Sequence, residues 1–491
     1  MQDFAVSVGM RAYRVSYLFR AAYDFFYRIE KTSWFLYGAG LVTRLTFVFY
    51  MFSQGGTSFI GGADHSQYQA LAKSIIVNHA FSLSALAPFI PDGLRTPGYP
   101  LFLGIFFFLT GGFFLAAIIQ AFLGAFIPVL VRKIGQTLGI SSRAGMFAAI
   151  ISIIDLNFLS NTASFQTESL FIPAFLFVLL YSLQSLKEYS YKHFFVQGIL
   201  FGALALIRPV FLYVGIGFFI SVAALNLWRF KKAVCIGILS IAAMVLAIFP
   251  WALRNHQQFN SYDLASIGPV NMYTRLAVSV LAVRDGVPFG TSYKNALHNL
   301  ALEGKIPDLN YPKDESALYD IRYNKLFNEE AVRVIRENPK AFFKLQANSV
   351  FAILTHDNTL NVLQLMNIAP LDAYPNFSVS FLFLTAPFKD FIFQVSSVIG
   401  GWYLIPFIGR AFWLLVVLFA GWGICMLFRI NTIYSSEKQS FILVLYCTIA
   451  FILVTLPIAL AIDARMRVPI EPFLLLFASH AFFSVMKKRE V

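Results

Sequence analysis

The amino-acid sequence predicts an all-α polytopic membrane protein, and three observations support this fold class. Apolar residues make up 58% of the 491 residues, and charged residues make up only 13%, against roughly 25% in a soluble domain. The apolar residues gather in runs long enough to cross a bilayer. Basic residues cluster in the short links between these runs. The composition excludes a soluble enzyme, a disordered scaffold and a disulfide-stapled secreted domain.

The first part of the chain predicts an interfacial segment followed by a transmembrane module. Residues 1–32 are basic and amphipathic and lack a small-residue cleavage site, so we interpret them as a cytoplasmic N-terminus rather than a signal peptide. Residues 33–251 form the transmembrane module, with a first outer loop at 53–112 that contains a short apolar helix at 99–110. The spans predicted in this module are 33–52, 113–131, 144–158, 165–186, 194–207, 210–228 and 233–251.

The second part predicts an extracytoplasmic segment at 252–400 and C-terminal transmembrane helices at 401–491. Apolar residues spaced among charges predict an amphipathic helix over 316–338 that ends before Pro339. Residues 343–400 leave two alternatives open, namely two further spans or interfacial helices. The last predicted spans are 403–428, 440–462 and 468–486. The total is ten spans, or twelve if residues 343–400 cross the membrane.

The positions of the basic links predict the orientation. The links at 132–143, 187–193 and 229–232 lie on one side if the N-terminus is cytoplasmic, and both termini then lie in the cytoplasm. These links explain much of the net charge of +13, so we expect membrane lipids and no nucleic acid as partners.

Two acidic residues stand out on the outward face. Asp64 precedes Gln67 by three residues, which is typical of a helix start, and Glu168 opens a span where acids suit the helix dipole. An ionised carboxylate at the membrane surface is also a candidate general base for an acceptor hydroxyl. Both interpretations hold together, because a carboxylate at a helix N-terminus stays ionised. Within the spans, Arg44 and Asp155 are candidates for a buried pair.

Outward arginines form the second unusual feature. Arg208, Arg254, Arg465 and Arg467 all lie at predicted outer ends of spans. Any one of them alone is more simply explained as an interfacial side chain that reaches toward water. Together they depart from the positive-inside pattern on one face, and guanidinium groups there suit a lipid-linked phosphate.

Metal and nucleotide motifs are absent from the sequence. No two outward histidines have a metal-ligand spacing, and there is no phosphate-binding loop, dinucleotide fingerprint or Ser/His/Asp signature. We therefore assign no metal-ligating residue and no cofactor, while a divalent metal is left open.

Several motifs, taken in order, resemble the GT-C superfamily of polytopic glycosyltransferases. The first outer loop reads GGADHSQYQALAKSI and then LRTPGYPLFLGIFF, and TESLF, ALIRP and PWALRN follow. ENPKAFF and RMRVPIEPFLLLFA continue the pattern. The nearest members are those like protein O-mannosyltransferases and lipid A aminoarabinose transferases. The likeness covers most of residues 41–255 and two later segments.

This resemblance implies an enzyme of the bacterial inner membrane that takes a sugar from a polyprenyl-phosphate carrier on the extracytoplasmic side. The acceptor would be a glycan, a lipid or a protein. Asp64 falls at the position of the catalytic acid of the family, and Glu168 falls where a second outer acid occurs. Arg95 stands where the aminoarabinose branch carries Glu, which puts a bound metal in doubt and makes contact between Arg95 and a phosphate plausible.

The mechanism expected from the resemblance is an inverting displacement in which Asp64 accepts the proton of the acceptor hydroxyl. Preorganised cations would stabilise the leaving phosphate. The candidate phosphate-binding residues are Arg208, Arg465, Arg467, Arg254 and Arg95. The candidate substrate-pocket residues are His65, Tyr68 and Tyr99. Two other functions remain open, a secondary transporter and an enzyme like the O-antigen polymerases and ligases.

Overall fold

A computed structural model describes residues 31–54, 63–84, 86–307, 318–370, 379–398, 401–429, 435–461 and 463–489. All the regular elements in these ranges are helices, apart from one isolated antiparallel bridge between Ser82 and Pro91. The predicted all-α fold class is confirmed. The cytoplasmic segment predicted at 1–32 lies almost wholly outside the described residues.

In the described ranges, six helical stretches are long and apolar enough to cross a membrane. They are α2 (Lys31–Ser53), α5 (Phe114–Gly124) with α6 (Ile127–Thr137), α9 (Thr167–Ser185), α12 (Phe230–Phe259), α21 (Leu404–Arg429) and α22 (Ser436–Thr455). Helices α7 (Ser142–Ile154) and α8 (Leu156–Ala163) would form a seventh span with a bend of 47°. The protein is therefore an integral membrane protein with several spans.

The count of ten spans predicted from hydropathy is not reached by length. The remaining predicted spans correspond to α10 (Tyr191–Ile207), α11 (Phe211–Leu225) and the apolar part of α23 (Glu471–Arg489), which are shorter helices. Between α10 and α11, Arg208 leaves the helical conformation and precedes Pro209, which ends one helix and starts the next. The sequence predicted this break, because the predicted spans 194–207 and 210–228 are separated by Arg208 and Pro209.

The bend between α7 and α8 changes the expectation for Arg44 and Asp155. The Asp155 carboxylate caps α8 by accepting from the backbone amides of Asn157 and Phe158, at 2.9 and 3.1 Å. The Arg44 guanidinium donates instead to the carbonyl oxygens of Gly40 and Ser152. Among the described residues the two side chains thus have separate hydrogen-bond partners.

Helix α9 lies in the centre of the membrane-embedded core and is buried on most sides. Its Phe171 and Phe175 rings are fully buried and stack with centroids 5.7 Å apart, and they also pack on Phe211 and Phe451 from other helices. Removing one such ring costs about 3–5 kcal/mol. Because α9 is held on most sides, the residue near its N-terminus, Glu168, is held in place as well.

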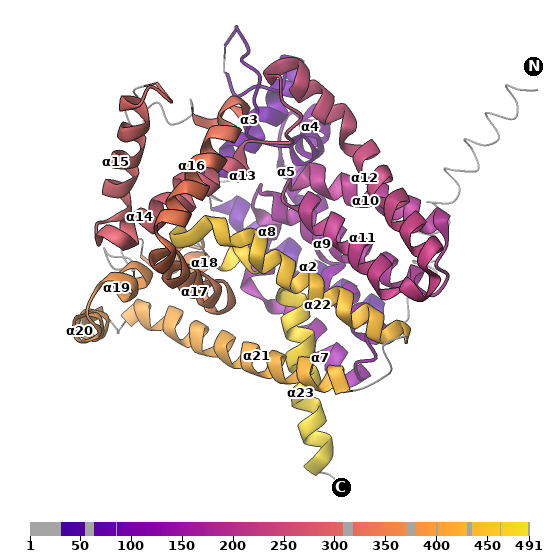
Figure 1. Ribbon diagram of the computed structural model, residues 1–491. Helices are drawn as coiled ribbons and strands as arrows, with labels where there is room; N and C mark the ends of the chain where they lie inside the picture. Colours follow the sequence, from indigo (N-terminus) through magenta and orange to yellow (C-terminus); the bar gives the residue numbers. More distant parts are fainter. Residues whose placement is uncertain are drawn as a thin grey trace, which may run out of the picture.

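The segment at 252–400, which the sequence predicts to be extracytoplasmic, has a core of its own. It contains α13 (Ile267–Val270), the π-helix η3 (Asn271–Ala277), α14 (Val278–Asp285), α15 (Phe289–Leu302), α16 (Asn324–Glu337) and α17 (Pro339–Thr355). Figure 1 shows α14, α15 and α16 grouped on the side of the molecule away from α10–α12. The Tyr273 ring of η3 stacks on Phe327 of α16 with centroids 5.5 Å apart. This packing fixes η3 against the rest of the segment.

The ambiguous region after Phe343 contains short helices. The last part of α17, then α18 (Thr359–Leu365), α19 (Val379–Thr385) and α20 (Phe388–Val398) cover its described parts, and none of them reaches the length of a span. The amphipathic helix predicted over 316–338 is observed as α16, and it ends before Pro339 as expected. The short helix predicted at 99–110 is α4 (Gly98–Thr110).

Candidate active site

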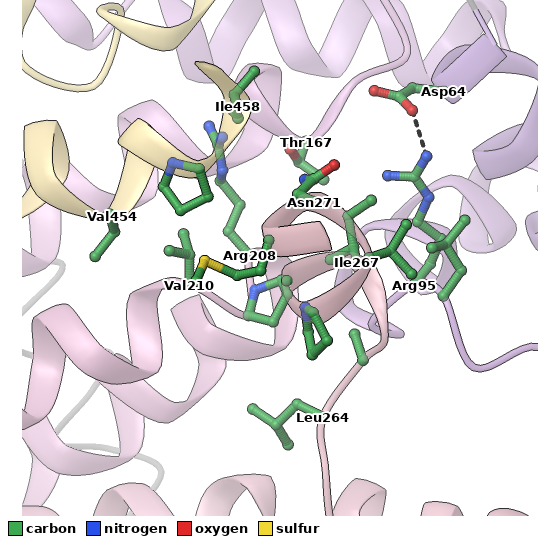
Figure 2. A pocket seen from close by; sticks show the side chains of 18 of the residues that line it. Asp64, Arg95, Thr167, Arg208, Val210, Leu264, Ile267, Asn271, Val454 and Ile458 are labelled. Carbon is green, nitrogen blue, oxygen red and sulfur yellow. Dashed lines mark hydrogen bonds and ion pairs between the residues drawn. The ribbon is translucent and has the colours of Figure 1, made fainter. Parts of the chain in front are cut away.

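A cavity of about 790 Å³ lies where α3 (Ala63–Val77), the start of α9, the junction of α10 and α11, and η3 come together. Figure 2 shows Asp64 and Arg95 joined at one end of it, with Arg208 and Ile458 farther across. Apolar side chains such as Val210, Leu264 and Ile458 line much of the wall. The charged residues that line the cavity are Asp64, Arg95, Glu168, Arg208, Asp263, Arg275, Asp463 and Arg465.

Asp64 lies in the first turn of α3, with its side chain 34% exposed. Its carboxylate accepts from Arg95 through one oxygen and from the Nη1 and Nη2 atoms of Arg465, at 3.3 Å each, through the other. The Gln67 side chain does not cap the helix start, as its spacing from Asp64 would have suggested. Its Oε1 accepts instead from the Nε and Nη2 atoms of Arg95, at 3.1 and 2.7 Å. The first turn of α3 is therefore organised around Arg95.

Arg95 is positioned by the loop that precedes α4. The Arg95 amide donates to the Asp92 carboxylate at 3.1 Å, and the guanidinium lies 5.0 Å from the centroid of the Tyr68 ring. A Cβ atom at Gly98 would come within 2.7 Å of the Leu206 carbonyl oxygen, so glycine permits the close approach of this loop to the end of α10. That approach brings Arg95 and the residue after α10, Arg208, to the same cavity.

Glu168 is the second residue of α9, and its side chain is 3% exposed. Its Oε1 lies 3.3 Å from Arg208 Nη1 and 3.4 Å from Arg465 Nε, and its Oε2 accepts from the Thr167 hydroxyl at 3.0 Å. Arg465 thus bridges the two carboxylates of the site. Buried carboxylates are stable only with such partners, so Glu168 holds Arg208 and Arg465 in place.

The arginines set the protonation of Asp64. Burial by itself would raise the pKa of its carboxyl, but the charges and hydrogen bonds of Arg95 and Arg465 outweigh burial and hold the pKa below its ordinary value. Asp463, which also lines the cavity, shows the opposite balance. Burial raises the pKa of Asp463 even though Arg465 is near. The site therefore holds Asp64 as an ionised carboxylate near neutral pH.

A divalent metal does not fit this set of donors. A metal ion needs several free carboxylate or imidazole ligands, whereas Asp64 and Glu168 are already engaged by three guanidinium groups. No group of three or more His, Cys, Asp or Glu residues with a metal-binding arrangement occurs in the part of the chain that the structure describes.

Arg254 lies outside the cavity lining, contrary to its expected role as a phosphate ligand. Its Nη1 atom donates to the Asp92 carbonyl oxygen at 2.8 Å, and its guanidinium lies within 5.5 Å of the ring centroids of Phe81, Trp251 and Phe259. It therefore supports the loop that carries Arg95.

Arg467 is also absent from the cavity. Its side chain is fully buried, and it pairs with Glu471 at 3.0 Å and lies 3.6 Å from the centroid of the Trp413 ring. A phosphate could not reach it without unfolding this contact. The sequence did not separate Arg467 from Arg465, because the two share one motif.

The three predicted pocket residues differ in their placement. Tyr68 lines the cavity, whereas His65 and Tyr99 pack behind it. The Tyr99 hydroxyl donates to Gln120 at 2.7 Å and accepts from Ser169 at 3.3 Å, and His65 Nδ1 accepts from the Phe165 amide at 3.3 Å. Both residues join the first outer loop to the α9 region.

Several residues that line the cavity were not expected from the sequence. Gln67, Asp463, Asn271 and Arg275 all line the cavity. Asp463 had a usable signal, because it lies two residues before Arg465, where the motif begins. Asn271 and Arg275 had none, since they come from the polar segment whose folding back over the cavity is a tertiary feature.

Comparisons with known proteins find similarity in structure only. Neither a protein-family model nor a curated protein sequence matches the chain. The oligosaccharyltransferase of Archaeoglobus fulgidus, solved with a tethered acceptor peptide containing the NVT sequon, matches with a TM-score of 0.45 and 13% identity. That match covers 91% of this chain and 50% of the archaeal one, so this chain spans about half of that length.

Two more solved structures match in the same way. The same archaeal enzyme, AglB, in complex with an inhibitory peptide and a dolichol-phosphate has a TM-score of 0.45 and 12% identity, covering 91% of this chain and 50% of that one. ArnT from Cupriavidus metallidurans, bound to undecaprenyl phosphate, has a TM-score of 0.39 and 11% identity, covering 92% and 78%. These proteins are GT-C glycosyltransferases, the superfamily whose motifs the sequence resembles.

Proposed function

We propose that the protein is a glycosyltransferase that moves a sugar from a polyprenyl-phosphate carrier to an acceptor hydroxyl on the extracytoplasmic side of the membrane. One observation carries the proposal. A partly exposed carboxylate, Asp64, and three arginines meet in a single cavity that is otherwise lined with apolar side chains, within a bundle of apolar helices. This combination suits a substrate with an anionic head group and an apolar tail.

The arginines fit the leaving group of such a reaction. As the bond between the anomeric carbon and the carrier phosphate breaks, negative charge grows on the phosphate oxygens. Arg208 and Arg465, with Arg95 beside them, can stabilise that charge from fixed positions. Glu168 keeps two of these guanidinium groups in place before the substrate arrives, so it is a positioning residue here.

Asp64 would act as the general base. An acceptor oxygen attacks the anomeric carbon from the face opposite the phosphate, and its proton passes to Asp64. The new glycosidic bond forms as the bond to phosphate breaks, which inverts the anomeric configuration and releases polyprenyl phosphate. Two arginines make Asp64 a weak base in the free protein. A bound phosphate competes for Arg465, and this competition would restore the basicity of Asp64 when the donor is present.

The proposed location follows from the basic links and the motifs. We propose the inner membrane of a bacterium, with the cavity on the extracytoplasmic side and both termini in the cytoplasm. The acceptor is a glycan, lipid or protein of the cell envelope.

The test is Asp64→Asn in the purified full chain. Incubated with a lipid extract of the source cells, the wild type should release polyprenyl phosphate from its sugar-linked form as acceptor is glycosylated, measured by mass spectrometry. Loss of the general base should lower the rate about 100-fold or more.

Asp285→Asn is the matched control, because Asp285 is 43% exposed and pairs only with its neighbour Arg284 among the described residues. It should transfer sugar at the rate of the wild type. Normal transfer by Asp64→Asn would refute the mechanism, and absence of any lipid-phosphate turnover in the wild type would refute the function.

A further inference from the structure

One arginine of the cavity differs from the others in having no anionic partner. Arg95, Arg208 and Arg465 all pair with Asp64 or Glu168. Arg275 lines the same cavity, and its guanidinium group makes no hydrogen bond or ion pair with any described residue. Its guanidinium has only a distant ring beside it, 5.9 Å from the centroid of Phe289. A half-buried cation in a cavity gains most from an anion that arrives with a ligand.

The backbone beneath Arg275 is unusual. Residues Asn271–Ala277 form a π-helix, a wide helical form that is rare and occurs frequently at functional sites. Asn271 and Arg275 both line the cavity, whereas Tyr273 and Leu276 are buried in the core of the extracytoplasmic segment. The core-facing residues hold the π-helix rigidly, and the other side presents an amide and a guanidinium to the cavity. Figure 2 shows the Asn271 side chain directed into this space.

Helix α16 adds amide groups to the same cavity. Asn324 is 4% exposed, and its Nδ2 atom donates to the Asp263 carboxylate at 2.8 Å. Its Oδ1 atom accepts no hydrogen bond from any described residue. Asn328, one helical turn later, also lines the cavity. A buried amide oxygen without a donor is costly, and a ligand hydroxyl would satisfy it.

The cavity has room for more than a donor phosphate group. Its volume of about 790 Å³ lies in the upper part of the range of roughly 300–1,000 Å³ that holds drug-sized ligands. In the proposed function, the donor phosphate takes the arginines that pair with Asp64 and Glu168. Arg275 comes from a different element, the extracytoplasmic segment, and is not needed for that phosphate.

From these observations we infer a second anion-binding site, in which Arg275 and the Asn271 amide bind a phosphate or carboxylate group of the acceptor and the Asn324 Oδ1 atom accepts a hydrogen bond from a hydroxyl of the same acceptor. The identity of the ligand as the acceptor rests on the proposed function, whereas the existence of the anion site does not. An acceptor that fits carries an anionic group near a free hydroxyl, as acidic glycans and phosphorylated sugars do. The group is bound and does not react, so it sets which acceptors enter.

The experiment measures binding to the full chain in phosphatidylcholine nanodiscs that are preloaded with polyprenyl phosphate. Glucose 6-phosphate is the anionic probe, and glucose is the uncharged one. Glucose 6-phosphate should raise the melting temperature, and glucose should not. Arg275→Gln should weaken the binding of glucose 6-phosphate on the order of 10-fold, and Arg275→Lys should weaken it less because the charge remains.

Arg284→Gln is the matched control, because Arg284 lies in the adjacent helix α14 and is 46% exposed. It should bind glucose 6-phosphate as the wild type does. Binding of polyprenyl phosphate should be the same in Arg275→Gln and the wild type, which also shows that the variant is folded. Failure of the wild type to bind polyprenyl phosphate would contradict the proposed function and leave the Arg275 site standing.

Three outcomes would overturn the inference: no effect of glucose 6-phosphate, equal affinity in Arg275→Gln and wild type, or displacement of glucose 6-phosphate by polyprenyl phosphate. Nanodiscs containing phosphatidylglycerol separate two sources of the anion. If phosphatidylglycerol abolishes the rise in melting temperature caused by glucose 6-phosphate, and does so only when Arg275 is present, the site binds the head group of a lipid acceptor. If the effect persists, the site takes a soluble anionic acceptor.

Discussion

Arg465 and Arg467 are two residues apart, yet they lie in opposite surroundings. Arg465 is 25% exposed and bridges Asp64 and Glu168 in the cavity. Arg467 and its partner Glu471 are both fully buried, with 3.0 Å between Nε and Oε1. The short helix η9 (Ala464–Met466) turns the chain between them, so their side chains leave it in different directions.

The buried pair joins helices, whereas the cavity cluster is open to a ligand. Arg467 Nη1 donates to the carbonyl oxygens of Ile353, Leu354 and His356, at the end of α17. Glu471 also accepts from Asn157 of α8 at 2.7 Å. The hydrogen bonds of this pair are all within the protein, while the Arg467 Nη2 and Glu471 Oε2 atoms are buried without a hydrogen-bond partner among the described residues. Both side chains are fully buried, so a lipid or substrate does not reach them. An arginine can bind a substrate only if the fold leaves its side chain accessible. The residue type alone does not reveal this accessibility.

The largest expected effect on stability comes from breaking the buried pair. Arg467→Ala leaves the Glu471 charge without its partner and should lower the free energy of unfolding by about 3–5 kcal/mol. Thermal unfolding of the purified protein in detergent measures this. The double variant Arg467→Met with Glu471→Leu removes both charges and should recover most of the loss. If Arg467→Ala unfolds like the wild type, the pair does not join these helices.

An intermediate effect is expected in the cavity. Arg465→Ala and Arg208→Ala should each weaken binding of polyprenyl phosphate about 10-fold, because a charge-assisted contact to phosphate is lost. The melting temperature as a function of polyprenyl phosphate concentration gives the affinity. Arg284→Ala, an exposed arginine outside the cavity, should bind as the wild type does. Full affinity in both cavity variants would remove the proposed phosphate site.

The smallest effect is a dependence of stability on pH. The folded pKa of Asp64 is below its ordinary value of 3.8, so its ion pairs add stability above that pH and lose it as the pH falls through the folded value. The difference in melting temperature between wild type and Asp64→Asn should therefore be greatest at neutral pH and shrink between about pH 5 and about pH 2. A constant difference over this range would show that the arginines do not stabilise the charged form.

Most of the charged residues that the sequence singled out lie together in the structure. Asp64, Glu168, Arg95, Arg208 and Arg465 were all expected at one outward face, and the structure brings them into one cavity. The roles assigned to them remain predictions. Among the described residues, six or seven helical stretches have the length of a span, and the other predicted spans correspond to shorter apolar helices such as the 15-residue α11.

Two expected phosphate ligands, Arg254 and Arg467, lie outside the cavity lining for a physical reason. Whether Arg254 and Arg467 face a cavity or a helix end depends on which residues come near them from distant parts of the chain. Arg254 donates to the Asp92 carbonyl oxygen, and Arg467 donates to the carbonyl oxygen of His356 at the end of α17. Neither contact can be predicted from the residues next to the arginine in the sequence.

The sequence by itself determined the membrane character, the helical fold and the set of charged residues on one face. Hydropathy and charge pattern are local properties, and the bilayer core favours apolar helices whose backbone hydrogen bonds are all internal. Only the tertiary structure decided which of those charges share a cavity. It also decided that the π-helix brings Asn271 and Arg275 to that cavity, because contacts between segments far apart in the chain fix the direction of each side chain.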